Sequence, residues 1–349
     1  MTSSKRNDRP SRTTISDVAA LAGVSAGAVS KAFNGTGSIS KATEARIRDA
    51  ARKLNWRPSA TAVALRTAKS QTVGLVLNRQ TRTSTLSPTS SELITGIESM
   101  LGEHDYGLLL HLFTRDQGEE TALYRRLVGS RRVDGIILTD SAIGDARYAL
   151  MRELNIPAVL VGVPWKGDPI PHLPGEGDGG MSAVARHLLD LGHRRIGYVG
   201  GPEDRVQVGA RRAGFEQELA KAGIVPSPVV SASAYSPAEA AQATSAMLNQ
   251  SDRPTAIVYG NDAMAIAGMR AARVAGLSLP DDLSVVGYDG SSASEWTEPQ
   301  LTTVQRNVVQ RGRAAAAILL RQLGEEISGD HDPAPPHLLI RASTAPPRR

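Results

Sequence analysis

The chain has 349 residues, of which 41% are apolar and 21% are charged, as in a soluble globular protein of two or three domains. It has no cysteine, which excludes disulfides, thiolate metal sites and cysteine nucleophiles. No apolar run approaches the ~20 residues of a membrane span, and the polar N-terminus lacks a secretory signal. We therefore expect a cytoplasmic protein that makes no membrane contact.

Positive charge is concentrated at the N-terminal end of the chain. Residues 1–70 hold 13 Lys or Arg against 4 Asp or Glu, whereas the remaining residues hold 27 against 31. A basic segment on a mildly acidic body is typical of a nucleic-acid-binding module joined to a separate globular domain. The alternative is a solvated basic tail, but the segment is patterned like a folded unit.

The basic segment carries the signals of a helix-turn-helix. Thr14 followed by Asp17 has the form of a capping box, and the helical spacing of apolar residues after it ends at Gly23, a residue suited to a left-handed helix end. Ser25 is then placed to cap a second helix over residues 26–33. This geometry lets the second helix lie in the major groove of DNA.

A third helix and a shorter segment follow. Ser40 is placed to cap a helix over residues 41–54, which completes a small three-helix core. Ser59 can cap a short helix after Pro58, but such a helix is too short to be stable alone in water. We expect it to order only when something holds it.

From residue 71 onward, short apolar runs alternate with amphipathic helical stretches. This alternation is typical of parallel, doubly wound sheets with helices on both faces, and the number of units favours two lobes. The expected strands are 72–77, 108–113, 135–138, 158–161, 196–199, 256–259 and 284–287, with a further strand at 337–342. The expected helices are 93–103, 183–191, 211–222, 238–248 and 264–275.

An ordered set of motifs along the chain resembles the LacI/GalR family of transcription regulators. After the helix-turn-helix segment TISDVAALAGVSAGAVSKAFNG and the segment RPSATAVALRT, the match continues through the body and covers roughly residues 13–345. The body motifs are GLVLN (74–78), VDGIIL (133–138), IPAVLVG (156–162), HLLDLGHRRIGYVGGP (187–202), RRAGF (211–215), PTAIVYGNDAMA (254–265), LPDDLSVVGYD (279–289) and PQLTTVQRN (299–307).

The resemblance implies an all-α helix-turn-helix domain followed by an α/β domain of two lobes like those of periplasmic sugar-binding proteins. The chain would cross between the lobes three times, and two copies would pair through residues 264–275 and the region of Trp296. The expected divisions are a disordered basic tail at 1–12, the helix-turn-helix domain at 13–57, a hinge helix and linker at 58–70, the effector-binding and dimerisation domain at 71–345, and a solvated tail at 346–349. Lobe one is expected at about 71–172 and 301–333, and lobe two at about 173–300 and 334–345.

The resemblance also implies which residues touch an operator in double-stranded DNA. They are Thr14, Ser25, Ala26, Gly27, Ser30, Lys31, Asn34, Ala62, Leu65 and Arg66. Leu65 would wedge into the minor groove and kink the duplex; the alternative is a core residue of an ordinary helix. Ala26 and Gly27 depart from the longer polar side chains that are common in the family, and neither can make a bidentate hydrogen bond to a base. More of the selectivity then falls to Ser30, Lys31, DNA shape and the hinge.

Polar residues follow several of the expected strands, where a ligand of such sheets sits. Asn78, Asn261 and Asp289 are three of them. The resemblance implies that Asn261 and Asp289 contact a small-molecule effector together with Arg211, and that Tyr235 packs on it. An Arg fork and a carboxylate suit the hydroxyls of a sugar or a carboxylate-bearing ligand. The alternatives are a surface ion pair for Arg211 and a loop cap for Asp289.

The sequence offers little for other chemistry. The Gly-rich stretch 175–180 does not follow a strand and carries carboxylates, so we do not expect it to bind phosphate, and the spacing of the histidines does not favour a metal site. We expect no cofactor. The resulting hypothesis is a homodimeric, effector-responsive regulator, most plausibly a repressor, rather than an enzyme. The rival readings are a sugar-processing enzyme with a DNA-binding appendage and a sugar-binding protein without a regulatory role.

Overall fold

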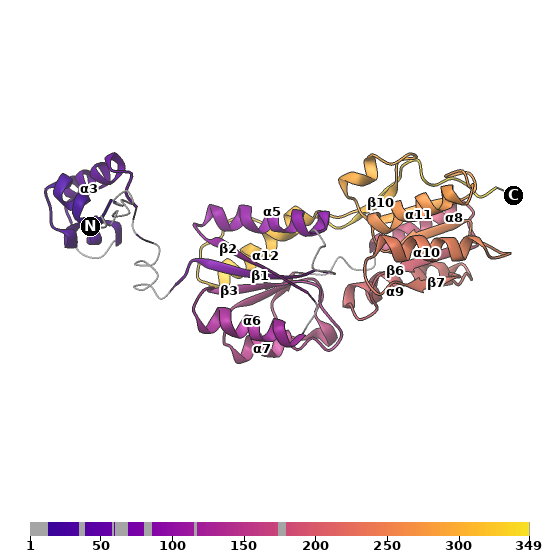
Figure 1. The fold of residues 1–349 in the computed structure, drawn as a ribbon, viewed down its shortest axis with the longest axis horizontal. Helices are drawn as coiled ribbons and strands as arrows, with labels where there is room; N and C mark the ends of the chain where they lie inside the picture. The colour runs from indigo at the N-terminus through magenta and orange to yellow at the C-terminus, as the bar shows by residue number, and fades with distance from the viewer. Residues whose placement is uncertain are drawn as a thin grey trace, which may run out of the picture. The chain divides into compact units, whose positions relative to one another are not determined.

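A computed structural model describes residues 13–34, 39–57, 59, 69–79, 86–114, 117–173 and 179–348. The chain divides into two compact units, Met1–Ser70 and Gln71–Arg349 (Figure 1). The predictions for Ala62, Leu65 and Arg66 lie outside the described residues, as does the expected tail at 1–12. In the part of the chain that is described, no helix is both long enough and apolar enough to cross a membrane.

The first unit contains the three expected helices. They are α1 (Ile15–Ala22), α2 (Ala26–Asn34) and α3 (Lys41–Lys53). The capping box at the start of α1 is present, and Gly23 ends that helix with a φ of 64°. Ser40 caps α3 by accepting from the Thr43 N–H. Val18, Val29 and Ile47, one from each helix, are fully buried in the core of this unit.

Lobe one of the second unit is a five-stranded parallel sheet in the order β2-β1-β3-β4-β5. Helices α5 and α12 cover one face and α6 and α7 the other (Figure 1). The strands are β1 (Thr72–Arg79), β2 (Gly107–Thr114), β3 (Gly135–Leu138), β4 (Ala158–Val161) and β5 (His172–Leu173), and the helices are α5 (Pro88–Glu103), α6 (Gln117–Gly129), α7 (Arg147–Glu153) and α12 (Val308–Gln322).

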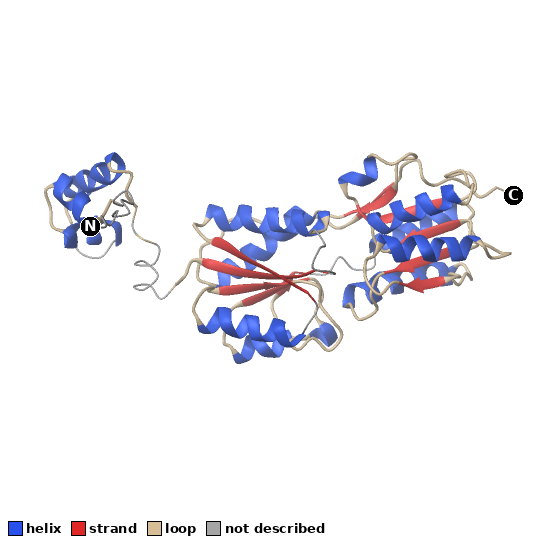
Figure 2. Cartoon of the chain, in the orientation of Figure 1, coloured by secondary structure: helices blue, strands red, loops and turns tan. Residues whose placement is uncertain are grey.

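Lobe two is a six-stranded sheet in the order β11-β10-β9-β8-β6-β7, parallel except for β11 (Figure 2). Helices α8 and α9 pack on one face, and α10 and α11 on the other. The strands are β6 (Ile196–Gly200), β7 (Val229–Ser231), β8 (Ala256–Tyr259), β9 (Ser284–Asp289), β10 (Thr302–Gln305) and β11 (His337–Leu339). The helices are α8 (Gly179–Asp190), α9 (Val206–Lys221), α10 (Pro237–Leu248) and α11 (Asp262–Val274).

The structure confirms the predicted fold class and corrects one expected division between the lobes. The chain passes between the lobes after β5, after β10 and after α12. The expected return to lobe one at residue 301 is wrong, because β10 pairs with β9 in the sheet of lobe two and only α12 lies on lobe one. In the expected tail at 346–349, Arg348 is exposed and makes surface ion pairs with Asp281 and Asp282 at 2.7 Å.

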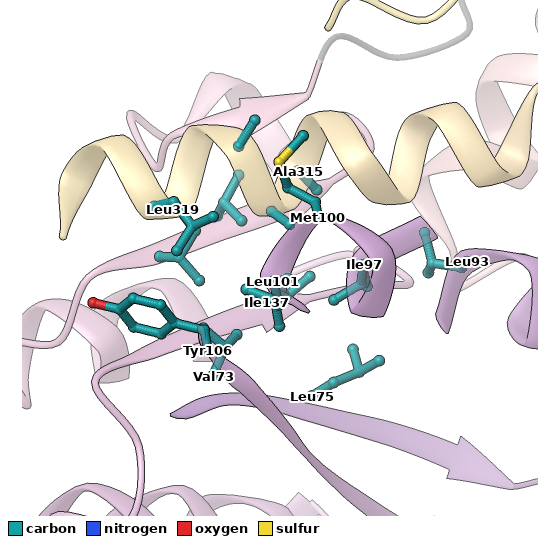
Figure 3. Packing of buried hydrophobic residues seen from close by; sticks show 14 of the residues in the cluster. Val73, Leu75, Leu93, Ile97, Met100, Leu101, Tyr106, Ile137, Ala315 and Leu319 are labelled. Atoms are coloured by element: carbon teal, nitrogen blue, oxygen red, sulfur yellow. The ribbon is translucent and has the colours of Figure 1, made fainter. Parts of the chain in front are cut away.

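Helices α5 and α12 cross in very close contact on lobe one. Gly96 of α5 and Gly312 of α12 allow this approach, since an added Cβ on Gly96 would lie 2.0 Å from the Val309 carbonyl oxygen. Beneath the crossing, Ile97 and Leu319 pack on Val73 of β1 in one apolar cluster (Figure 3). Helix α12 is thereby fixed to lobe one.

Candidate functional site

Helix α2 presents the face that sequence reasoning assigned to DNA. Val29 and Ala32 point into the core, whereas Gly27 and Lys31 are exposed and Ser30 is half-buried. Gly27 and Lys31 are four residues apart and therefore share one side of the helix. Gly27 has only a hydrogen atom in place of a side chain and is exposed, so the helix backbone is accessible at this point.

Three other predicted DNA contacts have local structural roles or lie beyond what is described. Ser25 begins α2, and its Oγ accepts from the Ala28 N–H at 3.2 Å. Thr14 caps α1: its Oγ1 accepts from the Asp17 N–H at 3.4 Å, and its own N–H donates to Asp17 Oδ2 at 2.7 Å. The side chain of Asn34 lies outside the described residues. Direct contact of these residues with DNA stays a prediction.

In the second unit, two of the predicted effector residues, Arg211 and Asp289, lie at Tyr288. Arg211 projects from α9 and is 7% exposed. Its guanidinium carbon lies 3.9 Å from the centroid of the Tyr288 ring, and its Nη1 donates to the Gly260 carbonyl at 3.3 Å. Such a stacked guanidinium is held in one orientation by the ring beneath it. The surface ion pair considered as an alternative for Arg211 does not fit this burial.

Asp289 ends β9, and its carboxylate is held from two directions. Oδ1 accepts from Arg306 Nη1 at 2.9 Å, and Oδ2 accepts from Thr89 Oγ1 at 3.2 Å. Its backbone φ of 119° lies in the left-handed region, which is uncommon for a residue other than glycine. Backbone strain of this kind persists only where the surrounding structure holds the residue in place, and it is concentrated at functional sites.

Sequence reasoning missed Arg306. It follows β10, whose register pairs Gln305 with Asp289, so the next residue reaches the same end of the sheet. The motif PQLTTVQRN contained the signal, but its threonine-rich strand does not look like a buried one. Thr89, in the first turn of α5, was missed as well, because nothing in the sequence links it to a residue 200 positions away.

Asp262 is a buried carboxylate whose charge interacts with that of Asp289. Its Oδ1 accepts from Thr303 Oγ1 at 2.5 Å, and its Oδ2 accepts from the Ser291 N–H at 2.6 Å. Burial raises the pKa of Asp262 to about 6, with a further contribution from the negative charge of Asp289, while the bond from Thr303 acts against the shift. The group thus titrates near neutral pH beside the candidate effector site.

The remaining predicted effector residues have distinct positions. Tyr235 precedes α10 and packs its ring against Gly201. Burial raises the pKa of the Tyr235 hydroxyl, although the nearby guanidinium of Arg211 partly opposes this rise. Asn261 caps α11, since its Oδ1 accepts from the Met264 N–H at 2.8 Å, so any contact with an effector stays a prediction. The side chain of Asn78 lies outside the described residues.

The two lobes meet at a second place besides Thr89 and Asp289. Ala142 of lobe one and Arg205 of lobe two form an antiparallel bridge, in which the Val206 N–H donates to the Ser141 carbonyl at 2.9 Å and the Ile143 N–H donates to the Asp204 carbonyl at 2.9 Å. Beside the bridge, Arg205 Nη1 donates to the Asp140 carbonyl and Gln207 Nε2 to the Asp140 carboxylate. This contact is largely made by main-chain atoms.

Within the described ranges, no group of three or more His, Asp or Glu side chains is placed to hold a metal ion. Two of the histidines, His187 and His193, make side-chain hydrogen bonds within lobe two. His193 is buried between Thr255 and Ser284, and burial lowers its pKa to about 4. His187 bonds to Thr344 instead.

Comparison with known proteins relates both units to one family. A model of the lacI family of bacterial regulatory proteins matches residues 14–59, and a model of a periplasmic binding protein-like domain matches residues 185–344. The HTH-type transcriptional repressor PurR of Haemophilus influenzae (strain PittEE) is 31% identical over 339 residues, which cover 95% of this chain and 98% of that protein. The chain belongs to the LacI family. It is a DNA-binding regulator of transcription and not an enzyme.

Solved structures of transcription regulators resemble this chain over most of its length. The lac repressor dimer bound to operator and the anti-inducer ONPF has a TM-score of 0.82 and 28% identity, and the match covers 95% of this chain and 99% of that one. The complex of the transcriptional regulator CelR with cellobiose has a TM-score of 0.71 and 28% identity, with coverage of 95% and 100%. Family membership therefore extends over the DNA-binding unit and both lobes.

Proposed function

We propose that this LacI-family protein represses transcription as a homodimer on a near-palindromic operator, and that a small carbohydrate held by Arg211, Tyr235 and Asp289 controls its affinity for DNA. The observation that carries the proposal is the buried guanidinium of Arg211, fixed on Tyr288 in the lobe that also holds Asp289. Burying a cation is costly unless polar or charged groups compensate it, so a buried guanidinium beside a carboxylate is the kind of group found in ligand sites.

The chemistry of the site supports a hydroxyl-bearing ligand. A guanidinium donates in a planar fork, a carboxylate accepts, and an aromatic ring covers an apolar face, which together match the hydroxyl groups and C–H face of a sugar. A structurally similar regulator has been solved with cellobiose. Effector binding would change the angle between the lobes and thereby bias the DNA-binding units of the dimer.

The exposed apolar side chains support dimerisation through the expected region. Trp296 is 86% exposed and Val274, at the end of α11, is 81% exposed. Leu110 and Leu112 add a further exposed apolar pair on β2, the edge strand of lobe one. Large apolar side chains exposed on an edge strand and a helix end are the kind that a partner covers. Two copies related by a two-fold axis would present two α2 helices to successive major grooves.

Selection of binding sites from random duplex DNA by the full-length chain tests the DNA-binding part of the proposal. We expect the enriched sequences to share an inverted repeat, because a two-fold symmetric dimer reads the same bases twice. Lys31→Ala in α2 should weaken binding to the selected site at least tenfold. Lys53→Ala, at the end of α3 and ion-paired with Asp49, is the matched control and should change little.

Two results would count against the proposal. One is enrichment of no sequence above background, and the other is equal loss of affinity in the Lys31 and Lys53 variants. The second result would mean that α2 contributes only general positive charge.

A further inference from the structure

The hydrogen bond between Thr89 and Asp289 joins residues of different lobes. Thr89 is the second residue of α5 in lobe one, and Asp289 is the last residue of β9 in lobe two. The Thr89 Oγ1 donates to Asp289 Oδ2 at 3.2 Å, while Arg306, from the same lobe as Asp289, takes Oδ1. A carboxylate beside the first turn of a helix is also favoured by the helix dipole. Lobe one therefore holds Asp289 through the oxygen that Arg306 does not use.

Glu92 places another group of α5 at this contact. It lies one turn after Thr89, and burial raises the pKa of its carboxyl group, with a further rise from the negative charge of Asp289 and an opposing effect of Arg306. Glu92, near the start of α5, thus interacts electrostatically with Asp289 at the end of β9 and with Arg306. Both Thr89 and Glu92 lie on the α5 face of lobe one.

The second contact between the lobes has a different character. The bridge from Ala142 to Arg205 is made by main-chain groups on the segment that leads into α7, and α7 covers the opposite face of the lobe-one sheet. The bridge is held by two main-chain hydrogen bonds of 2.9 Å, whereas the Thr89 contact is one hydrogen bond of 3.2 Å. Loss of that one bond removes the Thr89 contact, whereas the bridge has a second bond. The bridge is suited to act as a pivot, and the Thr89 bond as a latch.

We propose that Thr89 latches the two lobes together through Asp289, and that an effector hydroxyl which takes Asp289 from Thr89 releases the latch. The effector part rests on the proposed function, which makes Asp289 an effector ligand; the latch itself does not. Thr89 is then a positioning residue that competes with the effector for one acceptor. A ligand bound in lobe two would thereby break a contact of lobe one without touching lobe one itself.

The distance between the lobes in the full-length, ligand-free protein tests the latch. Because the chain has no cysteine, Thr121→Cys on α6 and Ala238→Cys on α10, both exposed, give a spin-label pair with one label in each lobe. In this background we expect Thr89→Val to raise the ratio of open to closed forms about tenfold, since one charge-assisted hydrogen bond is lost. Thr89→Ser, which keeps the hydroxyl, should retain the parent distance.

Matched and double variants make the result specific. Thr95→Val removes another hydroxyl from α5, one that bonds only within the helix to Ser91, and should leave the distance unchanged. Asp289→Ala should open the lobes as Thr89→Val does, and the double variant should open them no further. A parent distance in Thr89→Val, or full additivity in the double variant, would overturn the latch. Failure of the proposed function would appear separately, as loss of operator binding by the parent protein with the distances intact.

Discussion

At the scale of single residues, the candidate site is defined by charged groups that lobe two buries. Arg211 is oriented by the Tyr288 ring, and Asp289 by Arg306 and Thr89. Asp262 is the most perturbed carboxyl group among them, because it is buried and lies near a second negative charge. Groups with such shifts gather at functional sites, since a fold that sought stability alone would not bury them.

The shift of Asp262 has a definite consequence for stability. The folded protein keeps a proton on Asp262 that the unfolded chain releases between about pH 4 and pH 6. Stability from this group is therefore complete below pH 4 and is lost as the pH rises through 6, by about 3 kcal/mol. We expect the difference in unfolding free energy between the wild type and Asp262→Asn to fall by this order from pH 4 to pH 7. Urea unfolding of the second unit measures it, and parallel pH profiles would contradict the assignment.

The residue types of the site could be predicted, but their neighbours could not. Arg211 lies in the motif RRAGF and Asp289 ends the motif LPDDLSVVGYD, so the resemblance indicated both of them. Arg306 and Thr89 reach Asp289 only through the register of β10 and the approach of the opposite lobe. Asn261 follows β8 as predicted from the sequence. Its side-chain oxygen, however, accepts the hydrogen bond that caps α11, which the sequence analysis did not predict.

At the scale of elements, the helices that begin at a clear capping residue could be predicted from the local sequence. Thr14 and Ser40 start helices as predicted, because a hydroxyl before an amphipathic run is specific. Strand β10 was missed since three of its four residues are polar. Thr302 and Thr303 are buried only because Thr344 and Asp262 meet their hydroxyls. Helix α12 was not predicted, because its apolar residues are mostly alanines. It is part of the core since it packs against α5.

The crossing of α5 and α12 predicts an asymmetry between two glycines of one helix. Gly96→Ala places a methyl group 2.0 Å from the Val309 carbonyl oxygen, and we expect it to destabilise lobe one by about 3 kcal/mol or more. Gly102→Ala in the same helix meets only the Glu98 side chain at 3.9 Å and should be neutral or stabilising by up to about 1 kcal/mol. Thermal unfolding of the two variants checks this. Equal effects would mean that the helices do not pack as described.

At the scale of the whole molecule, charge and chemistry are divided between the two units. The excess of positive charge lies in the first 70 positions, which hold 13 Lys or Arg against 4 Asp or Glu, whereas the candidate effector site lies within the second unit. This division was predictable from composition, because a local excess of charge is visible without structure. The closeness of Thr89 to Asp289 was not, since it depends on how two lobes of one unit meet.

The division predicts how salt acts on the intact protein. The logarithm of operator affinity should fall linearly with the logarithm of salt concentration, with a slope set by the number of phosphates neutralised. Residues 71–349 alone should remain folded and show no such binding, because they form a compact unit without the basic segment. Filter binding from 50 to 300 mM salt gives both results. Salt-dependent DNA binding by residues 71–349 would contradict the assignment.

The proposed coupling of the Arg211 site to operator binding is tested most directly by one titration. Operator affinity is followed by fluorescence anisotropy while the carbohydrate that most raises the melting temperature of the wild type, chosen from a panel of mono- and disaccharides, is added. The wild type and Arg212→Ala, whose side chain is ion-paired with Glu216 at the surface, should change their operator affinity by about 5- to 150-fold. Arg211→Ala should not respond to the carbohydrate. It stays bound if the ligand acts as an inducer and stays unbound if the ligand acts as a corepressor. An Arg211→Ala protein that responds at the same carbohydrate concentrations as the wild type would contradict the account.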